Sequence, residues 1–200
     1  MDKKFKEYFN NGSNQTYLNH AAVGMMPLRC TEAMKSLIDQ LSQTGEPPIE
    51  QIMGKLNEFR FAIAQMAGAT PEEIAFIHNT TEGLSIALHS IDMRASDNII
   101  VQADAFPASL YIVHHIFEDV KKKYVPLNNG VDFYTRLIEN IDSHTRAIVL
   151  DHVHFLSGYR LNLEKLGDIA AQHGIYLIVD GIQAAGAISM NLNKSNVDFY

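Results

Sequence analysis

The sequence predicts an α/β fold with a mostly parallel sheet, preceded by a helical segment. Two observations indicate this class. From Thr70 onward, short apolar runs alternate with stretches of helical periodicity, which is typical of strands joined by crossover helices. The runs are almost continuously apolar, as in Ile175–Val179, and this is typical of parallel strands that are covered on both faces.

Two amphipathic helices are predicted before this alternation. The first follows Pro27 and has apolar residues at three- and four-residue spacing up to Leu41, before the Gly- and Pro-containing turn at residues 45–48. The second covers Ile49–Met66 and is closed by Gly68.

The elements after Thr70 follow in order. Strands are expected at Ile74–Ile77, Asn98–Val101, Ala147–Leu150 and Ile175–Val179, and helices at Thr81–His89, Ala108–Val120, Val131–Ile141 and Leu163–His173. The last of these helices has the clearest ends, because Asn162 can cap its start and Gly174 suits a left-handed residue after its end. We expect Lys121-Lys122-Lys123 to be a solvated helix end, and Asp198-Phe199-Tyr200 to open a further strand.

Composition and charge exclude several classes of function. The 200 residues are 46% hydrophobic and 20% charged, which is typical of globular domains. No apolar run approaches the ~20 residues of a membrane-spanning helix, so we expect no membrane association. The net charge of −7 disfavours a nucleic-acid partner. A single cysteine and the absence of an apolar export segment predict a cytoplasmic location.

Ligands of parallel sheets bind beyond the carboxyl ends of the strands, and several such ends carry candidate residues. Thr80 and Thr81 lie where a predicted strand runs into a helix, and a helix N-terminus suits an anion such as phosphate. Their alternative role is to cap the helix. The sequence contains no Gly-x-Gly-x-x-Gly and no P-loop motif, which disfavours a Rossmann dinucleotide site and a P-loop.

Asp180 ends a predicted buried strand, where a carboxylate is costly without a partner. It suits a cationic ring nitrogen or a metal, and Gln183 can place an amide beside the same ligand; the alternative is an aspartate that caps the next loop. Phe106, which Pro107 keeps out of the helical region, could stack on a planar ligand or be an ordinary core residue.

The run Asp151-His152-Val153-His154 places two histidines on one face of a strand. A metal site there could use Asp151 and His173 as further ligands. No third His or Cys at ligand spacing supports such a site, and we expect no metal.

Taken in order, these segments resemble the class V aminotransferase family, pyridoxal-phosphate enzymes of fold type I that include cysteine desulfurases, kynureninases and isopenicillin-N-epimerase-like proteins. The resemblance rests on Tyr17–Ala22, Asn79–Gly83, Asp104–Pro107, His152–Gly158 and Val179–Ala184, after which Asp198-Phe199-Tyr200 matches the run that leads towards the catalytic lysine. It implies that residues 49–200 form the three-layer large domain of that fold, incomplete at its C-terminus. Residues 1–48 would be an N-terminal arm and helix that belong to the small domain.

The resemblance also implies a site for pyridoxal 5'-phosphate. Thr80 and Thr81 would hold the phosphate, and Phe106 would stack on the pyridine ring. Asp180 would pair with the pyridinium nitrogen, so that the ring can act as an electron sink. Gln183 would hydrogen-bond the phenolic oxygen. Asn19, His20 and Ala21 would lie near the substrate.

In this family the lysine that forms the Schiff base follows shortly after the Asp-Phe-Tyr run, a position that lies beyond Tyr200. None of the lysines present matches it, and Lys194 precedes the run. The resemblance therefore implies the N-terminal portion of an enzyme. We expect little or no turnover from this polypeptide alone, because the Schiff-base amine is missing.

The implied enzyme acts at the amino-bearing carbon of a small amino acid, by transamination, epimerisation or β-elimination, and is a homodimer when complete. Phe106-Pro107 stands where typical cysteine desulfurases carry paired histidines, which favours the other members. Two alternatives remain open at this point. One is a non-catalytic interaction module that binds a partner through an unfinished sheet edge, and the other is a nucleotide- or metal-binding α/β protein.

Overall fold

The computed structural model describes residues 8–9, 16–127 and 130–200, and the chain forms two compact units, residues 1–58 and residues 59–200. Helix α2 (Leu28–Thr44) belongs to the first unit, and α3 (Ile49–Ala67) begins there. Both helices agree with the prediction. Gly45 ends α2 in the left-handed conformation, with φ of 68°, which a residue with a side chain adopts at a cost.

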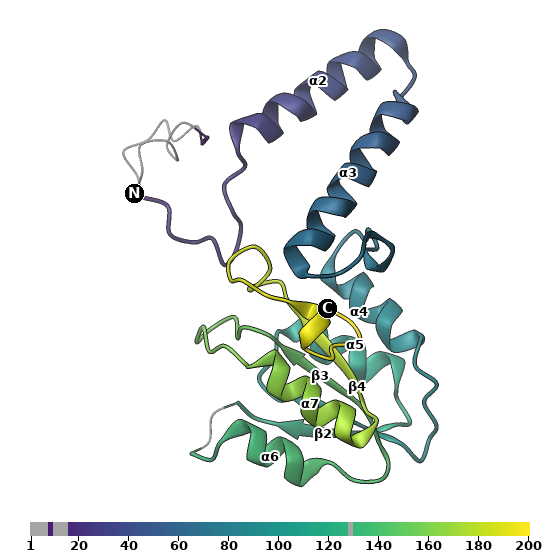
Figure 1. The fold of residues 1–200 in the computed structure, drawn as a ribbon, viewed down its shortest axis with the longest axis vertical. Coiled ribbons are helices and arrows are strands. Elements are labelled where there is room, and N and C mark those ends of the chain that lie inside the picture. The colour runs from purple at the N-terminus through teal and green to yellow at the C-terminus, as the bar shows by residue number, and fades with distance from the viewer. Residues whose placement is uncertain (1–7, 10–15, 128–129) are drawn as a thin grey trace. The chain divides into compact units, whose positions relative to one another are not determined.

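A four-stranded sheet forms the centre of the second unit (Figure 1). Its strands are β1 (Asn98–Gln102), β2 (Lys121–Val125), β3 (Thr145–Asp151) and β4 (Tyr176–Asp180). They are arranged in the order β2-β1-β3-β4, and all three pairings are parallel. The prediction of a parallel sheet is confirmed.

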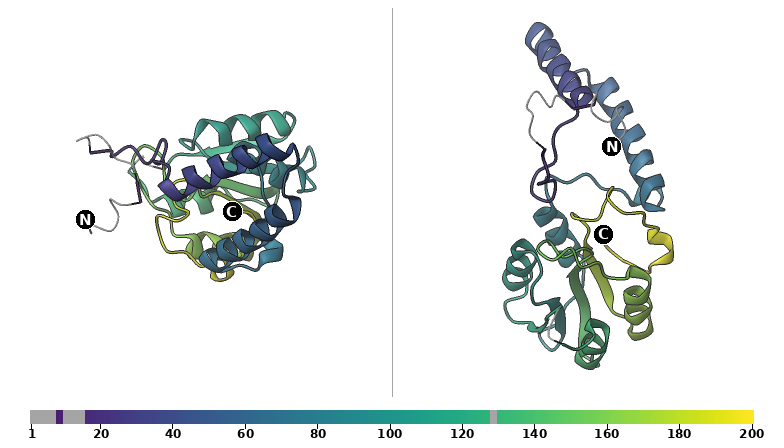
Figure 2. Two further views of the ribbon diagram at one scale, coloured as in Figure 1. Left: turned by 90° about the horizontal axis from the view of Figure 1, so that it is seen from above. Right: turned by 90° about the vertical axis from the view of Figure 1, so that its left-hand side faces the viewer.

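Helices cover both faces of this sheet, and α5 and α7 lie on opposite sides of the strands (Figure 2). The helices are α4 (Thr80–His89), α5 (Pro107–Ile116), α6 (Phe133–Asn140) and α7 (Leu163–His173). Alternate strand residues face alternate sides, so two separate cores form. One core joins α4 and α5 to the face that carries Val149 and Ile178, and the other joins α6 and α7 to the face that carries Ile148 and Leu177. The predicted three-layer arrangement is confirmed.

Helix α7 begins and ends at the predicted residues. The Oδ1 atom of Asn162 accepts a hydrogen bond from the amide of Lys165 at 3.0 Å, and Gly174 follows the helix with φ of 64°. Capping residues at both ends therefore fix this element from local sequence alone.

The prediction of a strand at Ile74–Ile77 is wrong. This segment follows the short 3-10 helix η1 (Pro71–Glu73) and pairs with no strand in the part of the chain that the structure describes. Side chains of α3 hold it instead. The Nε atom of Arg60 donates to the carbonyl oxygen of Ile74 at 3.1 Å, and the rings of Phe59 and Phe76 stack at 5.7 Å. An apolar run becomes a strand only where a neighbouring backbone completes the ladder.

The prediction of a helix end at Lys121–Lys123 is also wrong, because α5 ends at Ile116 and the three lysines open β2 at the edge of the sheet. The ammonium groups of two of them contact oxygen atoms. Lys122 Nζ donates to the carbonyl oxygen of Phe117, and Lys123 Nζ donates to Asp142 Oδ2 at 2.7 Å. Lysines on an edge strand discourage pairing with a second sheet. A run of lysines with this role has the same composition as a solvated helix end, so the two cannot be told apart from the sequence.

The run Asp198-Phe199-Tyr200 lies beside β4. Phe199 forms a parallel bridge with Ile178, and its carbonyl oxygen accepts a hydrogen bond from the amide of Val179 at 2.8 Å. The prediction that this run begins to extend the sheet is confirmed.

Within the described ranges, none of the helices has the length and apolar character needed to cross a lipid bilayer.

Candidate functional site

Two buried carboxylates lie side by side at the carboxyl ends of β3 and β4. Asp151 and Asp180 are register partners, and each is 4% exposed. Burial raises the pKa of Asp180, although its hydrogen bond from the amide of Ile182 opposes the shift. Burial also raises the pKa of Asp151 to about 6, and the negative charge of Asp180 adds to this effect. A cationic group beside the pair would relieve the cost of ionising both.

The backbone of Phe106 is hydrogen-bonded to this pair. The backbone amide of Phe106 donates to Asp151 Oδ2 at 2.9 Å, and its side chain is 43% exposed. The ring of Phe155 meets it edge-on at 5.3 Å. Phe106 is therefore not a core residue, and its exposed ring can cover a planar ligand.

Three buried polar atoms near the strand ends lack a hydrogen-bond partner among the described residues: Gln102 Nε2, Ser109 Oγ and Asp151 Oδ1. Ser109 lies in α5, where its hydroxyl faces Asp180 and lowers the pKa of that carboxyl without a hydrogen bond of normal geometry. Buried polar atoms without partners are costly. A polar, partly cationic ligand would supply what these atoms lack, so the residues present fit the cofactor that the sequence implies.

The start of α4 carries Thr80 and Thr81. Asn79 caps this helix, because its Oδ1 atom accepts from the amide of Glu82 at 2.9 Å, so the alternative that either threonine is the cap is wrong. Thr81 is exposed and Thr80 is half-buried. Helix α4 leads through residues 90–97 into the amino end of β1, so its start faces the other end of the sheet, where Asp180 lies. The positive end of the helix dipole there attracts anions.

Gln183 lies three residues after Asp180 in the turn that follows β4, and it is half-buried. Asn19, His20 and Ala21 belong to the unit of residues 1–58. There the Tyr17 ring meets the His20 ring edge-on at 5.2 Å. The functional roles of Gln183 and of these three residues stay predictions.

The structure adds Asp151 to the candidate site. The sequence suggested Asp151 only as one ligand in the disfavoured metal site, although it ends a buried strand just as Asp180 does. That shared position was the available signal. Ser109 carries no such signal, since a serine inside a helix is ordinary.

The two histidines that follow β3 bond to different partners. His152 Nδ1 lies 2.9 Å from the hydroxyl of Tyr200, and His154 Nε2 lies 2.8 Å from the carbonyl oxygen of Asp104. Among the described residues there is no group of three or more His, Cys, Asp or Glu that could hold a metal ion.

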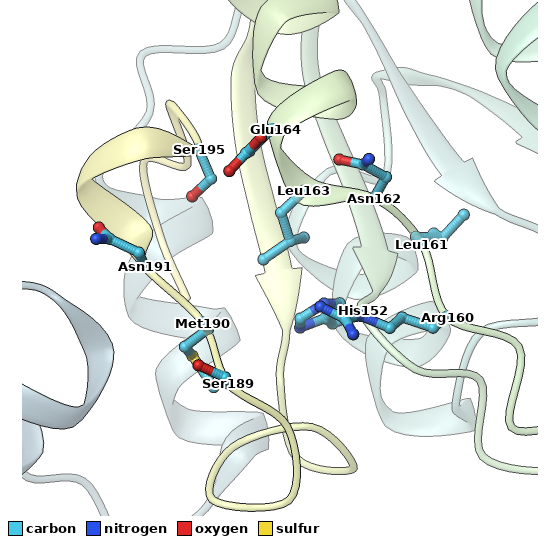
Figure 3. A pocket seen from close by; sticks show the side chains of 10 residues that line it. All are labelled: His152, Arg160, Leu161, Asn162, Leu163, Glu164, Ser189, Met190, Asn191 and Ser195. Atoms are coloured by element: carbon cyan, nitrogen blue, oxygen red, sulfur yellow. The ribbon is translucent and has the colours of Figure 1, made fainter.

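A separate pocket of about 300 Å³ lies between the start of α7 and residues 189–195 (Figure 3). His152 and Arg160 line it. Burial and the charge of Arg160 lower the pKa of His152 to about 4. None of the predicted cofactor residues lines this pocket, so it is distinct from the site around Asp180.

The chain is similar to known proteins in sequence and in structure. The aminotransferase class-V profile matches residues 16–200. The uncharacterized aminotransferase YcbU of Bacillus subtilis (strain 168) is 23% identical over 204 residues, covering 99% of this chain and 53% of that protein. A cysteine desulfurase of Escherichia coli O7:K1 (strain IAI39 / ExPEC) is 25% identical over 201 residues, covering 95% of this chain and 50% of that enzyme.

Solved structures give the same picture. A C-DES mutant with glycine covalently linked to its PLP cofactor is 25% identical, with a TM-score of 0.86 over 96% of this chain and 53% of that one. The cysteine desulfurase CsdA from Escherichia coli is 21% identical, with a TM-score of 0.82, and supports the fold alone. The fold is that of fold type I PLP-dependent enzymes. The chain spans about half the length of the curated relatives it matches.

Proposed function

Because the chain belongs to the class-V aminotransferase family, we propose that it carries the phosphate-, ring- and nitrogen-binding part of a pyridoxal 5'-phosphate site. Members of this family use pyridoxal 5'-phosphate. When bound, this cofactor supplies an electron sink for reactions at the amino-bearing carbon of an amino acid. The observation that carries the proposal is the buried Asp151–Asp180 pair, to which the backbone amide of the exposed Phe106 donates a hydrogen bond.

Asp180 serves as the partner of the protonated ring nitrogen. Its carboxylate is held at the tip of β4 by the amide of Ile182, at 2.9 Å from Oδ1. A cation beside it favours the ionised form and offsets the effect of burial on its pKa. Asp180 thereby keeps a proton on the nitrogen throughout the reaction.

Thr80 and Thr81 bind the phosphate with their hydroxyls and with the positive end of α4. Phe106 covers one face of the ring and excludes water from it. The side-chain N–H of Gln183 donates a hydrogen bond to the phenolic oxygen.

The substrate is a small amino acid, and the reaction is transamination, epimerisation or β-elimination. A neighbour described as the cystine C-S lyase C-DES, solved with its reaction product cysteine persulfide, supports β-elimination among these. The aromatic Phe106 in place of paired histidines supports a reaction other than that of typical cysteine desulfurases. That the complete protein is a homodimer and lies in the cytoplasm stays a prediction from the sequence.

We also propose that residues 1–200 bind the cofactor without forming a Schiff base and show little turnover alone. The test is equilibrium dialysis of the chain with pyridoxal 5'-phosphate, together with absorbance spectra after an amino acid is added. We expect saturable binding and no amino-acid-dependent spectral change. Asp180→Ala weakens binding by about 10-fold or more, because a charge-assisted hydrogen bond contributes about 1.5–3 kcal/mol.

Asp92→Ala, which removes an exposed carboxylate, is the matched control and leaves the affinity unchanged. Equal affinity in the Asp180 and Asp92 variants would refute the assigned site. Absence of any binding, with retained affinity for a nucleotide or for a partner protein, would support the alternatives. Rapid turnover by the wild-type chain would contradict the expected inactivity.

A further inference from the structure

The loops that follow β1 and β3 are fastened to each other beside Phe106. Three contacts join them: Phe106 N–H to Asp151 Oδ2 at 2.9 Å, His154 Nε2 to the Asp104 carbonyl oxygen at 2.8 Å, and the edge-on contact of Phe106 with Phe155 at 5.3 Å. We call Asp151, His154 and Phe155 the loop clamp.

The hydrogen bonds of His154 fix where its proton lies. A carbonyl oxygen can only accept, so Nε2 carries the hydrogen and donates it to Asp104. Nδ1 accepts a hydrogen bond from the amide of Ser157 at 3.3 Å, and the Ser157 hydroxyl lies 2.8 Å from it. His154 is 7% exposed, and both of its ring nitrogens are satisfied in this neutral tautomer. The ring therefore links the loop after β3 to the loop after β1 and is held in one orientation.

The loop after β1 is also held on its other side. The carboxylate oxygens of Asp104 accept from the amide of Leu127 at 3.2 and 3.3 Å. The backbone that carries Phe106 is thus anchored to two segments, residues 151–155 and the segment around Leu127, while the Phe106 ring stays 43% exposed. An exposed aromatic ring ordinarily samples several rotamers, and here a fixed backbone and the edge of Phe155 restrict it.

We propose that Asp151 and His154 are positioning residues that fix the orientation of the Phe106 ring for stacking on the cofactor. The proposal rests on the proposed function only in naming pyridoxal 5'-phosphate as the partner of the ring. Asp151 acts through the Phe106 amide and His154 through the Asp104 carbonyl. Their effect is preorganisation, since a ring already in place loses less conformational entropy when a ligand stacks on it.

The sequence contains no tryptophan, so Phe106→Trp places a single fluorescent reporter at the stacking position. Fluorescence anisotropy of this Trp without any ligand reports how tightly residue 106 is held. Quenching by added pyridoxal 5'-phosphate reports stacking. We expect high anisotropy in the Phe106→Trp parent, and lower anisotropy when Asp151→Ala or His154→Ala is added. Half-maximal quenching then requires about 10-fold more pyridoxal 5'-phosphate.

Asp151→Asn is the conservative variant, because its amide oxygen can still accept the hydrogen bond from residue 106. We expect it to retain the parent anisotropy. Ser157→Ala removes only the hydroxyl beside His154 Nδ1 and gives a smaller effect in the same direction. This variant tests the clamp even where Asp151→Ala fails to fold.

Asp142→Ala is the matched control. Asp142 anchors a loop at the opposite end of the sheet, where it accepts from Asn98 Nδ2 at 2.8 Å and from the amide of His144 at 2.9 Å. Its loss lowers stability and leaves the reporter unchanged. Equal anisotropy in the parent, Asp151→Ala and His154→Ala would overturn the proposal. If anisotropy falls as expected but pyridoxal 5'-phosphate never quenches the parent, the positioning of residue 106 stands and the proposed cofactor fails.

Discussion

The carboxylate of Asp180 lies beside that of Asp151 across two paired strands, where burial and then this neighbouring negative charge raise the pKa of Asp151 to about 6. The folded state therefore binds a proton at Asp151 more tightly than the unfolded chain does. We therefore compare the unfolding free energies of the wild type and Asp151→Asn. The difference favours the wild type most near pH 4, and it falls by about 2 kcal/mol as the pH rises to 7. Urea denaturation of both proteins at several pH values measures this, and parallel curves would contradict it.

The contribution of His152 to stability has the opposite pH dependence, because burial and the charge of Arg160 lower the pKa of His152 to about 4. Below pH 6.5 the His152 ring binds a proton in the unfolded chain, whereas in the folded chain it stays neutral down to about pH 4. The contribution of His152 to stability is thus present at pH 7 and is lost as the pH falls towards 4, by up to about 3 kcal/mol. His152→Asn removes this loss. The measurement is urea denaturation with NMR titration of the histidine ring protons, and a His152 signal that titrates near pH 6.5 would refute the prediction.

Gly167 lies inside α7, where alanine ordinarily stabilises a helix by about 1 kcal/mol. Here a Cβ atom would overlap the backbone carbonyl oxygen of Ser195, and the backbone cannot move far enough to relieve the overlap without cost. Gly167→Ala is expected to destabilise the protein by about 3 kcal/mol. Gly54→Ala in α3 is the matched control, because a Cβ there meets no described atom within 4 Å, and it raises stability. Chemical denaturation compares the two, and a stabilising Gly167→Ala would contradict the packing of residue 195 against α7.

The pKa of Asp142 lies well below its usual value, mainly because Lys123 Nζ donates to it, with further hydrogen bonds from Asn98 and His144. Lys123→Met is expected to raise this pKa towards the ordinary range. Lys121→Met, at an exposed position of the same strand, leaves it unchanged. NMR titration of the Asp142 carboxyl carbon measures both. Equal values in the two variants would show that Lys123 does not hold this carboxylate.

The sequence predicts elements well where the deciding contacts are local. Helix α7 is recognisable because Asn162 and Gly174 lie at its ends, and β1, β3 and β4 because their residues are apolar on both faces. Strand β2 is missed because three lysines at a sheet edge have the composition of a solvated helix end. Ile74–Ile77 is overpredicted because no local signal shows whether a neighbouring strand exists.

The same distinction applies to the site. Asp180 and Phe106 are recognisable because each follows a predicted strand. The bond from the Phe106 amide to Asp151 spans 45 positions of the chain, and only the register of β3 against β4 reveals that Asp151 and Asp180 are neighbours. These relationships depend on the assembled sheet and leave no trace in either segment alone.

The two margins of the sheet have different consequences for its growth. The lysines of β2 make one margin unfavourable for another backbone, whereas the backbone of β4 already accepts Phe199 in parallel. A further strand is therefore expected to pair at the β4 edge of the sheet and not at the β2 edge. A segment that pairs with β4 in parallel places the side chains at its carboxyl end beside Asp180, because the carboxyl ends of parallel strands share one edge of the sheet.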